Sequence, residues 1–191
     1  MRDGFIRTAA ATPKIKVADP VHNRETICRI IEEYEKKGAE LLVFPELCLS
    51  GYTCNDLFQQ EILLEQVKEE LKNLVDFTKG RKMLLFAGLP WEHEGKLYNV
   101  AAAICDGELL GLVTKTNMPN YSEFYELRHF TPGMEIPVLT DWLDTRSLWE
   151  PTCCLPVRRI RSLRWQLRSV RMCGYRARQA SAMRLPAPQL L

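Results

Sequence analysis

Along the first 113 residues, short apolar runs alternate with longer segments whose apolar residues recur at helical spacing. Strands are expected at 5–11, 39–44, 83–88, 97–104 and 108–113, and helices at about 19–37 and 56–80. The run at 39–44 is continuously apolar, which is typical of a strand covered on both faces. Asp106 and Gly107 favour a tight hairpin turn between the last two strands. This order predicts an α/β fold, with helices packed on one face of a mixed sheet.

Each predicted helix has its own start signal. Asp19 and Pro20 offer a start signal for the first helix, which should end at Gly38. Asp56 is expected to cap the second helix, whose apolar stripe runs from Leu64 to Val75.

The charge balance changes abruptly near Arg146. Of the 26 Lys and Arg residues, 17 occur up to Arg146 and 9 after it, whereas 23 of the 24 Asp and Glu residues come before Ser147. The net charge is therefore −6 before the break and +8 after it. Because residues 147–191 also lack helical or strand periodicity, two parts are predicted. Residues 1–146 should form part of a folded domain, and residues 147–191 an Arg-rich, disordered segment.

Composition also indicates where the protein resides and whether it binds a metal. Residues 1–12 carry charge without a long apolar core, and no run is long enough to span a bilayer, so a cytoplasmic protein with no membrane partner is expected. The cysteines show no CxxC pair and no zinc-ligand spacing with histidine, which predicts reduced, buried thiols and no metal site. The seven are Cys28, Cys48, Cys54, Cys105, Cys153, Cys154 and Cys173.

Two residues at predicted strand ends could carry chemistry. Glu46 follows the run at 39–44, and Lys115 follows the run at 108–113. Taken singly, Glu46 also fits a solvated loop carboxylate and Lys115 a surface ammonium. Together they are more informative, because amide cleavage needs a base for its nucleophile and a cation for the tetrahedral intermediate.

Four segments in matching order and spacing resemble the carbon–nitrogen hydrolases, or nitrilases. They are TAAATPKIKVADP (8–20), FPELCLSGY (44–52), GLPWEHEGKLYNVAA (88–102) and KTNMPNYSEFYELRHFTPG (115–133). The runs GYTCNDL and PNYSEFYE look specifically like the N-terminal glutaminase domain of bacterial glutamine-dependent NAD synthetases. The resemblance implies an α/β/β/α sandwich, of which this chain would hold the first half.

The resemblance also implies roles for individual residues. Glu46 would be the general base, Lys115 would stabilise the oxyanion, and a cysteine would attack the side-chain amide of glutamine. Tyr121 matches a position that contacts glutamine. Tyr52 and Glu126 lie in matching segments, where they would shape the pocket or simply pack.

The implied reaction releases glutamate and ammonia, and the ammonia feeds ATP-dependent synthesis of NAD from deamido-NAD. The amidase half needs no cofactor. ATP, Mg and deamido-NAD would bind a synthetase domain, normally in the same chain, and no Gly-rich phosphate-binding loop of such a domain occurs here. The full-length protein is expected to be a homo-oligomer.

The sequence departs from the family at the nucleophile, because no segment of the type E-I-C-E-D-x-W is present. When Arg168–Leu191 is back-translated with suitable synonymous codons and read one base earlier, the hidden frame spells EICEDVWVPGTPSIRHALAGATII. The cysteine codon then straddles Ser169 and Val170. A frameshift near Arg146–Trp149 is therefore predicted, and with it a truncated chain without catalytic activity.

Two other functions fit the sequence less well. A free-standing amidase of the same family would share the motifs, and DNA downstream would distinguish it. A non-enzymatic, Arg-rich nucleic-acid-binding protein would use the nine arginines as phosphate contacts. Trp149, Trp165 and Tyr175 are not interleaved with them as a stacking platform, which argues against it.

Overall fold

The structure is a computed structural model that describes residues 5–122 and 124–133 and the backbone of four further strands. Seven strands form one mixed sheet in the order β1-β2-β3-β4-β5-β7-β6, and β8 pairs with β9 separately. The strands are β1 (Thr8–Ala10), β2 (Leu41–Val43), β3 (Leu84–His93), β4 (Lys96–Cys105), β5 (Glu108–Thr114), β6 (Val138–Trp142), β7 (Thr145–Glu150), β8 (Cys153–Leu155) and β9 (Trp165–Leu167).

Strand direction decides which loops meet. β1, β2 and β3 are parallel, β4 is antiparallel to both of its neighbours, and β5 therefore runs in the direction of β2 and β3. The carboxyl ends of β2 and β5 thus lie at the same edge of the sheet, although more than 60 residues separate Val43 from Thr114.

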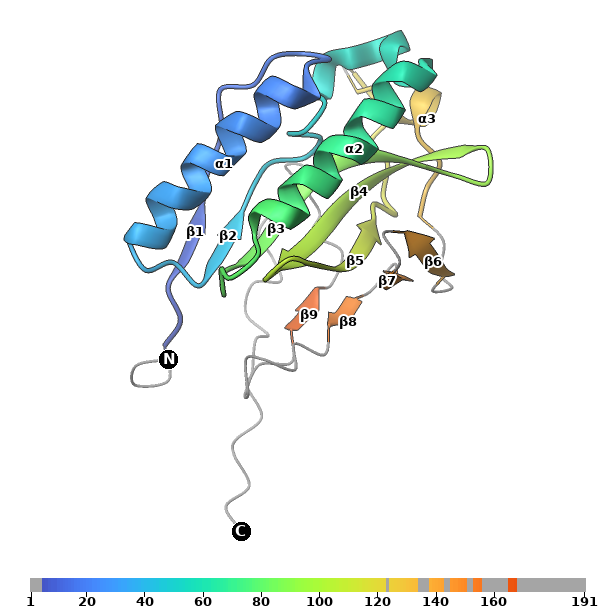
Figure 1. The fold of residues 1–191 in the computed structure, drawn as a ribbon. Helices are drawn as coiled ribbons and strands as arrows, with labels where there is room; N and C mark the ends of the chain where they lie inside the picture. Colours follow the sequence, from blue (N-terminus) through green and yellow to red (C-terminus); the bar gives the residue numbers. More distant parts are fainter. Residues whose placement is uncertain are drawn as a thin grey trace.

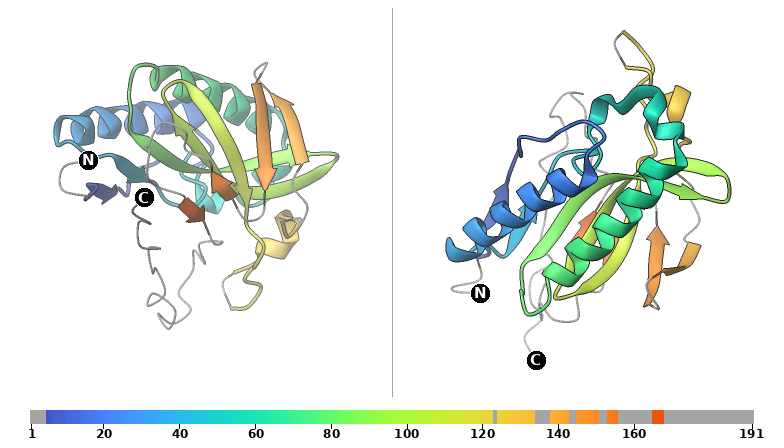
Figure 2. Two further views of the ribbon diagram at one scale, coloured as in Figure 1. Left: turned by 90° about the horizontal axis from the view of Figure 1, so that it is seen from below. Right: turned by 45° about the horizontal axis from the view of Figure 1, so that its top comes forward.

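Helices α1 (Pro20–Lys36) and α2 (Glu61–Phe77) lie side by side on one face of this sheet (Figure 1). The view from below shows both helices on the same side (Figure 2). α1 begins at Pro20, as predicted, and the backbone N–H of His22 donates to the Asp19 carboxylate at 3.0 Å, so Asp19 caps the helix. Within the described part of the chain, no helix is long and apolar enough to cross a bilayer.

Both faces of the central strands are buried. In β3, Leu85, Ala87 and Leu89 belong to the core beneath the helices, whereas Leu84 and Phe86 belong to a second cluster on the opposite face. Burying one such leucine or phenylalanine contributes roughly 1.5–3 kcal/mol. One helical layer on one sheet corresponds to half of the α/β/β/α sandwich, which confirms the fold class predicted from the sequence.

The second helix begins later than predicted. α2 starts at Glu61, its N-cap residue Gln60 makes no side-chain cap, and a 3₁₀ helix, η1 (Tyr52–Gln59), precedes it. Asn55 has a φ of 50°, which no α-helix allows, so the helix cannot extend back to Asp56. The Asp56 carboxylate instead pairs with Arg128 at 3.0 Å.

Two hairpins connect the central strands. The predicted turn at Asp106–Gly107 is confirmed, since both residues have positive φ angles (51° and 78°). A second turn of the same kind, at Glu94–Gly95 (50° and 71°), joins β3 to β4 and was not predicted. β3 consequently runs to His93, five residues beyond its expected end at Gly88.

Strands also occur where the sequence predicted no regular element. β7 contains Arg146, the expected boundary, and pairs in parallel with β5. β6 pairs with β7 on the side away from β5 and forms the edge of the sheet. The two strands are orange in Figure 2. Apart from β8 and β9, the segment after Glu150 lies outside the described residues, and so does the expectation that it is disordered.

Candidate active site

The structure brings the two strand-end residues together. Glu46 lies in the loop after β2, Lys115 follows β5 directly, and Lys115 Nζ is 2.7 Å from Glu46 Oε1. Only 12% of the Glu46 side chain and 11% of the Lys115 side chain are exposed. The solvated alternatives for these residues are therefore wrong. Such an edge, at the carboxyl ends of parallel strands, is where open α/β sheets commonly place their sites.

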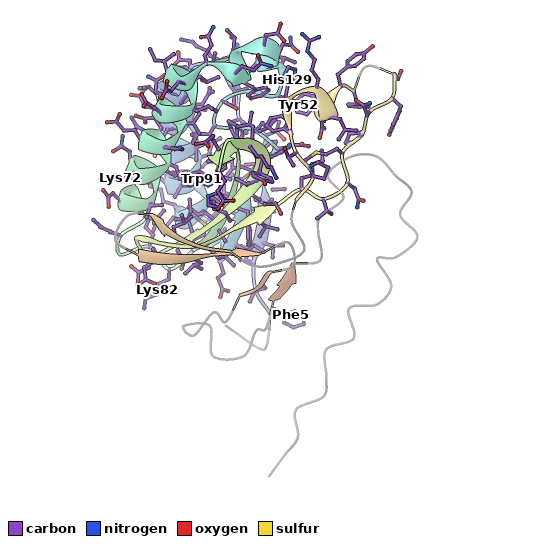
Figure 3. All side chains as sticks on the ribbon, turned by 90° about the vertical axis from the view of Figure 1, so that its right-hand side faces the viewer. Phe5, Tyr52, Lys72, Lys82, Trp91 and His129 are labelled. Atoms are coloured by element: carbon purple, nitrogen blue, oxygen red, sulfur yellow. The ribbon has the colours of Figure 1, made fainter. Side chains whose placement is uncertain are left out.

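A second carboxylate holds Lys115 from the other side. Glu126 is the first residue of the short helix α3 (Glu126–His129), and its two oxygens lie 2.8 Å and 2.7 Å from Lys115 Nζ. The Tyr52 hydroxyl donates to Glu126 Oε1 at 2.8 Å. In Figure 3, Tyr52 and the neighbouring His129 lie at the end of the molecule where η1 meets α3. Sequence reasoning placed Glu126 only near the pocket, whereas it is a direct partner of Lys115.

Burial and charge shift the proton affinities of this cluster. Burial raises the pKa of the Glu46 carboxyl, the Glu126 charge raises it further, and Lys115 and Asn99 oppose the rise. Burial lowers the pKa of the Lys115 ammonium, but its bonds to Glu126 and Glu46 outweigh this, so the net direction is upward. Lys115 is thus a permanent cation at neutral pH, and Glu46 is a better proton acceptor than a solvated glutamate.

The loop that carries Glu46 rests directly on β3 at Gly88. A Cβ atom added to Gly88 would lie 2.4 Å from the Leu47 nitrogen, 2.6 Å from the Pro45 oxygen and 2.8 Å from the Glu46 Cα. Leu47, with a φ of 50°, turns the chain at this point, and the Leu49 N–H donates to the Gly88 carbonyl at 3.1 Å. This close approach fixes the backbone from which Glu46 extends.

Sequence reasoning missed one residue of the site. Asn99, on β4, is 3% exposed, and its Nδ2 donates to Glu46 Oε1. The available signal was an amide side chain within an otherwise apolar strand, where a polar group requires a partner.

Four cysteines lie in the described part of the chain, and one of them is close to Glu46 in sequence. Cys28, Cys48, Cys54 and Cys105 are buried and unoxidised, as predicted for them. Cys48, two residues after Glu46, donates its thiol to the Gly88 carbonyl, and burial raises its pKa to about 12. It is protonated at neutral pH and unsuited to attack. The expected position of the nucleophile, near Ser169 and Val170, lies outside the described residues.

Tyr121 stands apart from the hydrogen-bonded cluster. It lies in the loop after Lys115, is 59% exposed, and packs edge-on against Phe124 with ring centroids 5.7 Å apart. An exposed aromatic ring at this place is accessible to a ligand.

The raised Glu46 pKa predicts a pH signature. Between the ordinary value of 4.5 and the raised value, the folded state binds the Glu46 proton more tightly than the unfolded state, so stability falls as pH rises through this window. Glu46→Gln should remove that fall, which urea denaturation at a series of pH values would measure. Glu92→Gln is the control of opposite sign. The hydrogen bond from the Gly95 N–H lowers the pKa of the Glu92 carboxyl below 4.5. The stability that Glu92 contributes to the folded state is therefore lost as pH falls. Identical pH curves for wild type and Glu46→Gln would contradict the assignment.

Comparison with known proteins identifies relatives of this chain. The profile of the carbon-nitrogen hydrolase family matches residues 7–148. A glutamine-dependent NAD(+) synthetase of Mycobacterium bovis is 39% identical over 130 residues, which are 68% of this chain and 19% of that protein. The corresponding enzyme of Aquifex aeolicus is 39% identical over 119 residues, or 62% and 21% of the two chains. The chain thus spans about a fifth of the length of these curated relatives.

Two solved structures share the fold of this chain. A glutamine-dependent NAD(+) synthetase from Cytophaga hutchinsonii superposes with a TM-score of 0.72 at 27% identity, covering 76% of this chain and 25% of that one. An amidase from Nesterenkonia sp. shares the fold, with a TM-score of 0.58 at 24% identity over 72% of this chain and 51% of its own.

Proposed function

Because the chain belongs to the carbon–nitrogen hydrolase family, we propose that Glu46 and Lys115 are the base and the cation of a glutamine-hydrolysing site. The observation that carries the proposal is the buried contact of 2.7 Å between Lys115 Nζ and Glu46 Oε1. The relatives described as glutamine-dependent NAD(+) synthetases support glutamine as the substrate.

The proposed reaction is amide hydrolysis through a thioester. Glu46 takes the proton of a cysteine thiol, and the sulfur forms a bond to the side-chain amide carbon of glutamine. Lys115 stabilises the negative oxygen of the tetrahedral intermediate. Glu46 then returns its proton to the nitrogen as the C–N bond breaks and ammonia leaves. Water activated by Glu46 cleaves the thioester to glutamate and restores the thiol.

The other side chains of the site hold this arrangement in place. Glu126 keeps Lys115 charged and directed at the reaction centre, and Tyr52 holds Glu126 by its hydroxyl. Tyr121, on the exposed loop, is proposed to contact the glutamine.

The nucleophile is proposed to come from the hidden reading frame. In that reading, residues 147–191 are an out-of-frame sequence, and the chain itself does not hydrolyse glutamine. The frame-restored protein, in which one base near the codons of Arg146–Trp149 is added or removed so that EICED is read, would carry the cysteine.

In the complete protein, the ammonia would serve ATP-dependent synthesis of NAD from deamido-NAD on a synthetase domain. That domain would bind ATP, Mg and deamido-NAD, and the amidase half would need no cofactor. A cytoplasmic homo-oligomer is the proposed form of the whole protein.

Ammonia release from glutamine tests the proposal. The purified chain should release no more ammonia than buffer, whereas the frame-restored protein should release ammonia and be inactivated by iodoacetamide at the restored cysteine. Asparagine and acetamide serve as control substrates that separate a glutaminase from a general amidase. An inactive frame-restored protein that is folded would overturn the proposed function. Ammonia release by the present chain would overturn its predicted inactivity, and mass spectrometry of the alkylated protein would locate the reactive thiol.

A further inference from the structure

Asn99 touches both halves of the site. It lies near the start of β4, the strand between β3 and β5, and its side chain donates from Nδ2 to Glu46 Oε1. Its main-chain carbonyl accepts the Lys115 N–H at 2.8 Å. The residue therefore fixes the position of the Glu46 carboxylate relative to the backbone of Lys115.

The two donors to Glu46 reach the same oxygen. Lys115 Nζ lies 2.7 Å from Oε1, and Asn99 Nδ2 donates to Oε1 as well. Among the described residues, no hydrogen bond reaches Oε2. Oε2 is therefore the oxygen whose lone pairs remain available for a proton.

We propose that Asn99 is a positioning residue that holds Oε1 of Glu46 and so directs Oε2 to act as the proton acceptor. This inference rests on the proposed function of Glu46 as the base. Lys115 alone could bond to either oxygen, because an ammonium is a point charge with three rotatable donors. A planar amide on a buried strand has no such freedom, so Asn99 selects the oxygen.

Positioning and simple packing predict opposite results. If Asn99 only fills space, its replacement loosens the site, admits water, and moves the Glu46 pKa down toward its ordinary value, because burial is what raises it. If Asn99 stabilises the charged carboxylate through its N–H, its removal moves the Glu46 pKa further up.

The experiment is a ¹³C NMR titration of the glutamate carboxyls in the present chain, with the Glu46 signal assigned by its loss in Glu46→Gln. Asn99→Leu keeps the side-chain size and removes the donor, and it should decrease proton dissociation from Glu46 about tenfold, as expected for a hydrogen bond to a charged group. Asn99→Ala is the second variant and should shift Glu46 in the same direction.

Asn73→Leu is the matched control, because Asn73 Nδ2 donates to Glu70 Oε1 on α2, away from the site. It should leave Glu46 unchanged. The Glu92 pKa is lowered by the hydrogen bond from the Gly95 N–H in the β3–β4 turn. An unchanged Glu92 titration in each variant therefore shows that this hairpin is intact.

A Glu46 pKa that is unchanged or lower in both Asn99 variants, with Glu92 unaltered, overturns the inference. The outcome is separable from the proposed function. A raised pKa together with a frame-restored protein that cannot hydrolyse glutamine would keep the role of Asn99 and reject the reaction. Glutamine hydrolysis by the frame-restored protein, together with an unchanged Glu46 pKa in the Asn99 variants, would keep the reaction and reject the role of Asn99.

Discussion

Lys115→Met is expected to reduce ammonia release by the frame-restored protein about 10²–10³-fold, which is the usual effect of removing one group that stabilises an oxyanion. The loss has two causes. The cation beside the developing negative charge disappears, and Glu46 and Glu126 then face each other without the ammonium that now bonds to both. Repulsion from Glu126 should then raise the pKa of the Glu46 carboxyl further, which moves the acidic limb of the rate–pH profile to higher pH.

Lys68→Met is the matched control for this prediction. Lys68 Nζ also pairs with a glutamate, Glu92, at 3.4 Å, and it lies over the Trp91 ring, but it is on α2 and outside the site. Steady-state rates of both variants across a pH series provide the measurement. If Lys115→Met kept more than a tenth of the wild-type rate, Lys115 would not be the oxyanion-stabilising group.

The sequence alone could locate Glu46 and Lys115 because both follow strongly apolar strands. Strand ends are where open α/β sheets place their sites, which made both residues candidates, and the family resemblance linked them. The sequence could not show that the contact is direct and buried. That depends on β5 being brought parallel to β2 by the hairpins, and the β3–β4 turn was missed since Glu94–Gly95 is a weaker turn signal than Asp–Gly.

Glu126 and Asn99 could not be found in the same way. α3 is only four residues long, too short for any helical period, and its glutamate becomes a site residue only when the loop returns to Lys115. Asn99 has its partner 53 residues earlier in the chain. Contacts of this range follow from sheet register rather than from local pattern.

The predicted start of α2 at Asp56 was wrong, because a local sequence signal favoured a helix that the structure begins only at Glu61. Asp56 has the side chain of an N-cap residue and precedes an apolar stripe, yet Asn55 interrupts the helix and Asp56 pairs with Arg128 of α3. That contact belongs to the same η1–α3 junction that holds Tyr52 against Glu126. The tertiary contact of this junction thus overrides the helix signal.

Gly88→Ala is expected to destabilise the fold by about 1–3 kcal/mol, the usual cost of forcing an extra carbon into a packed core. The added Cβ would meet the Leu47 nitrogen at 2.4 Å and the Glu46 Cα at 2.8 Å. Because these are backbone atoms, the loop itself must move. Glu46 should then leave Lys115, and the frame-restored protein should lose most of its glutamine hydrolysis.

Gly95→Ala separates this steric effect from a backbone effect. Gly95 has a φ of +71° and no atom within 4 Å of the added Cβ, so its substitution costs only left-handed strain, about 1–2 kcal/mol. Both variants can lose stability in urea denaturation, but only Gly88→Ala should alter the Glu46 titration. A glutamate at position 46 is therefore not sufficient for the site. The loop must also hold its backbone in place, because a glutamate on a displaced backbone cannot reach Lys115. If Gly88→Ala left the Glu46 titration and the hydrolysis rate unchanged, the contact with β3 would not be what positions the base.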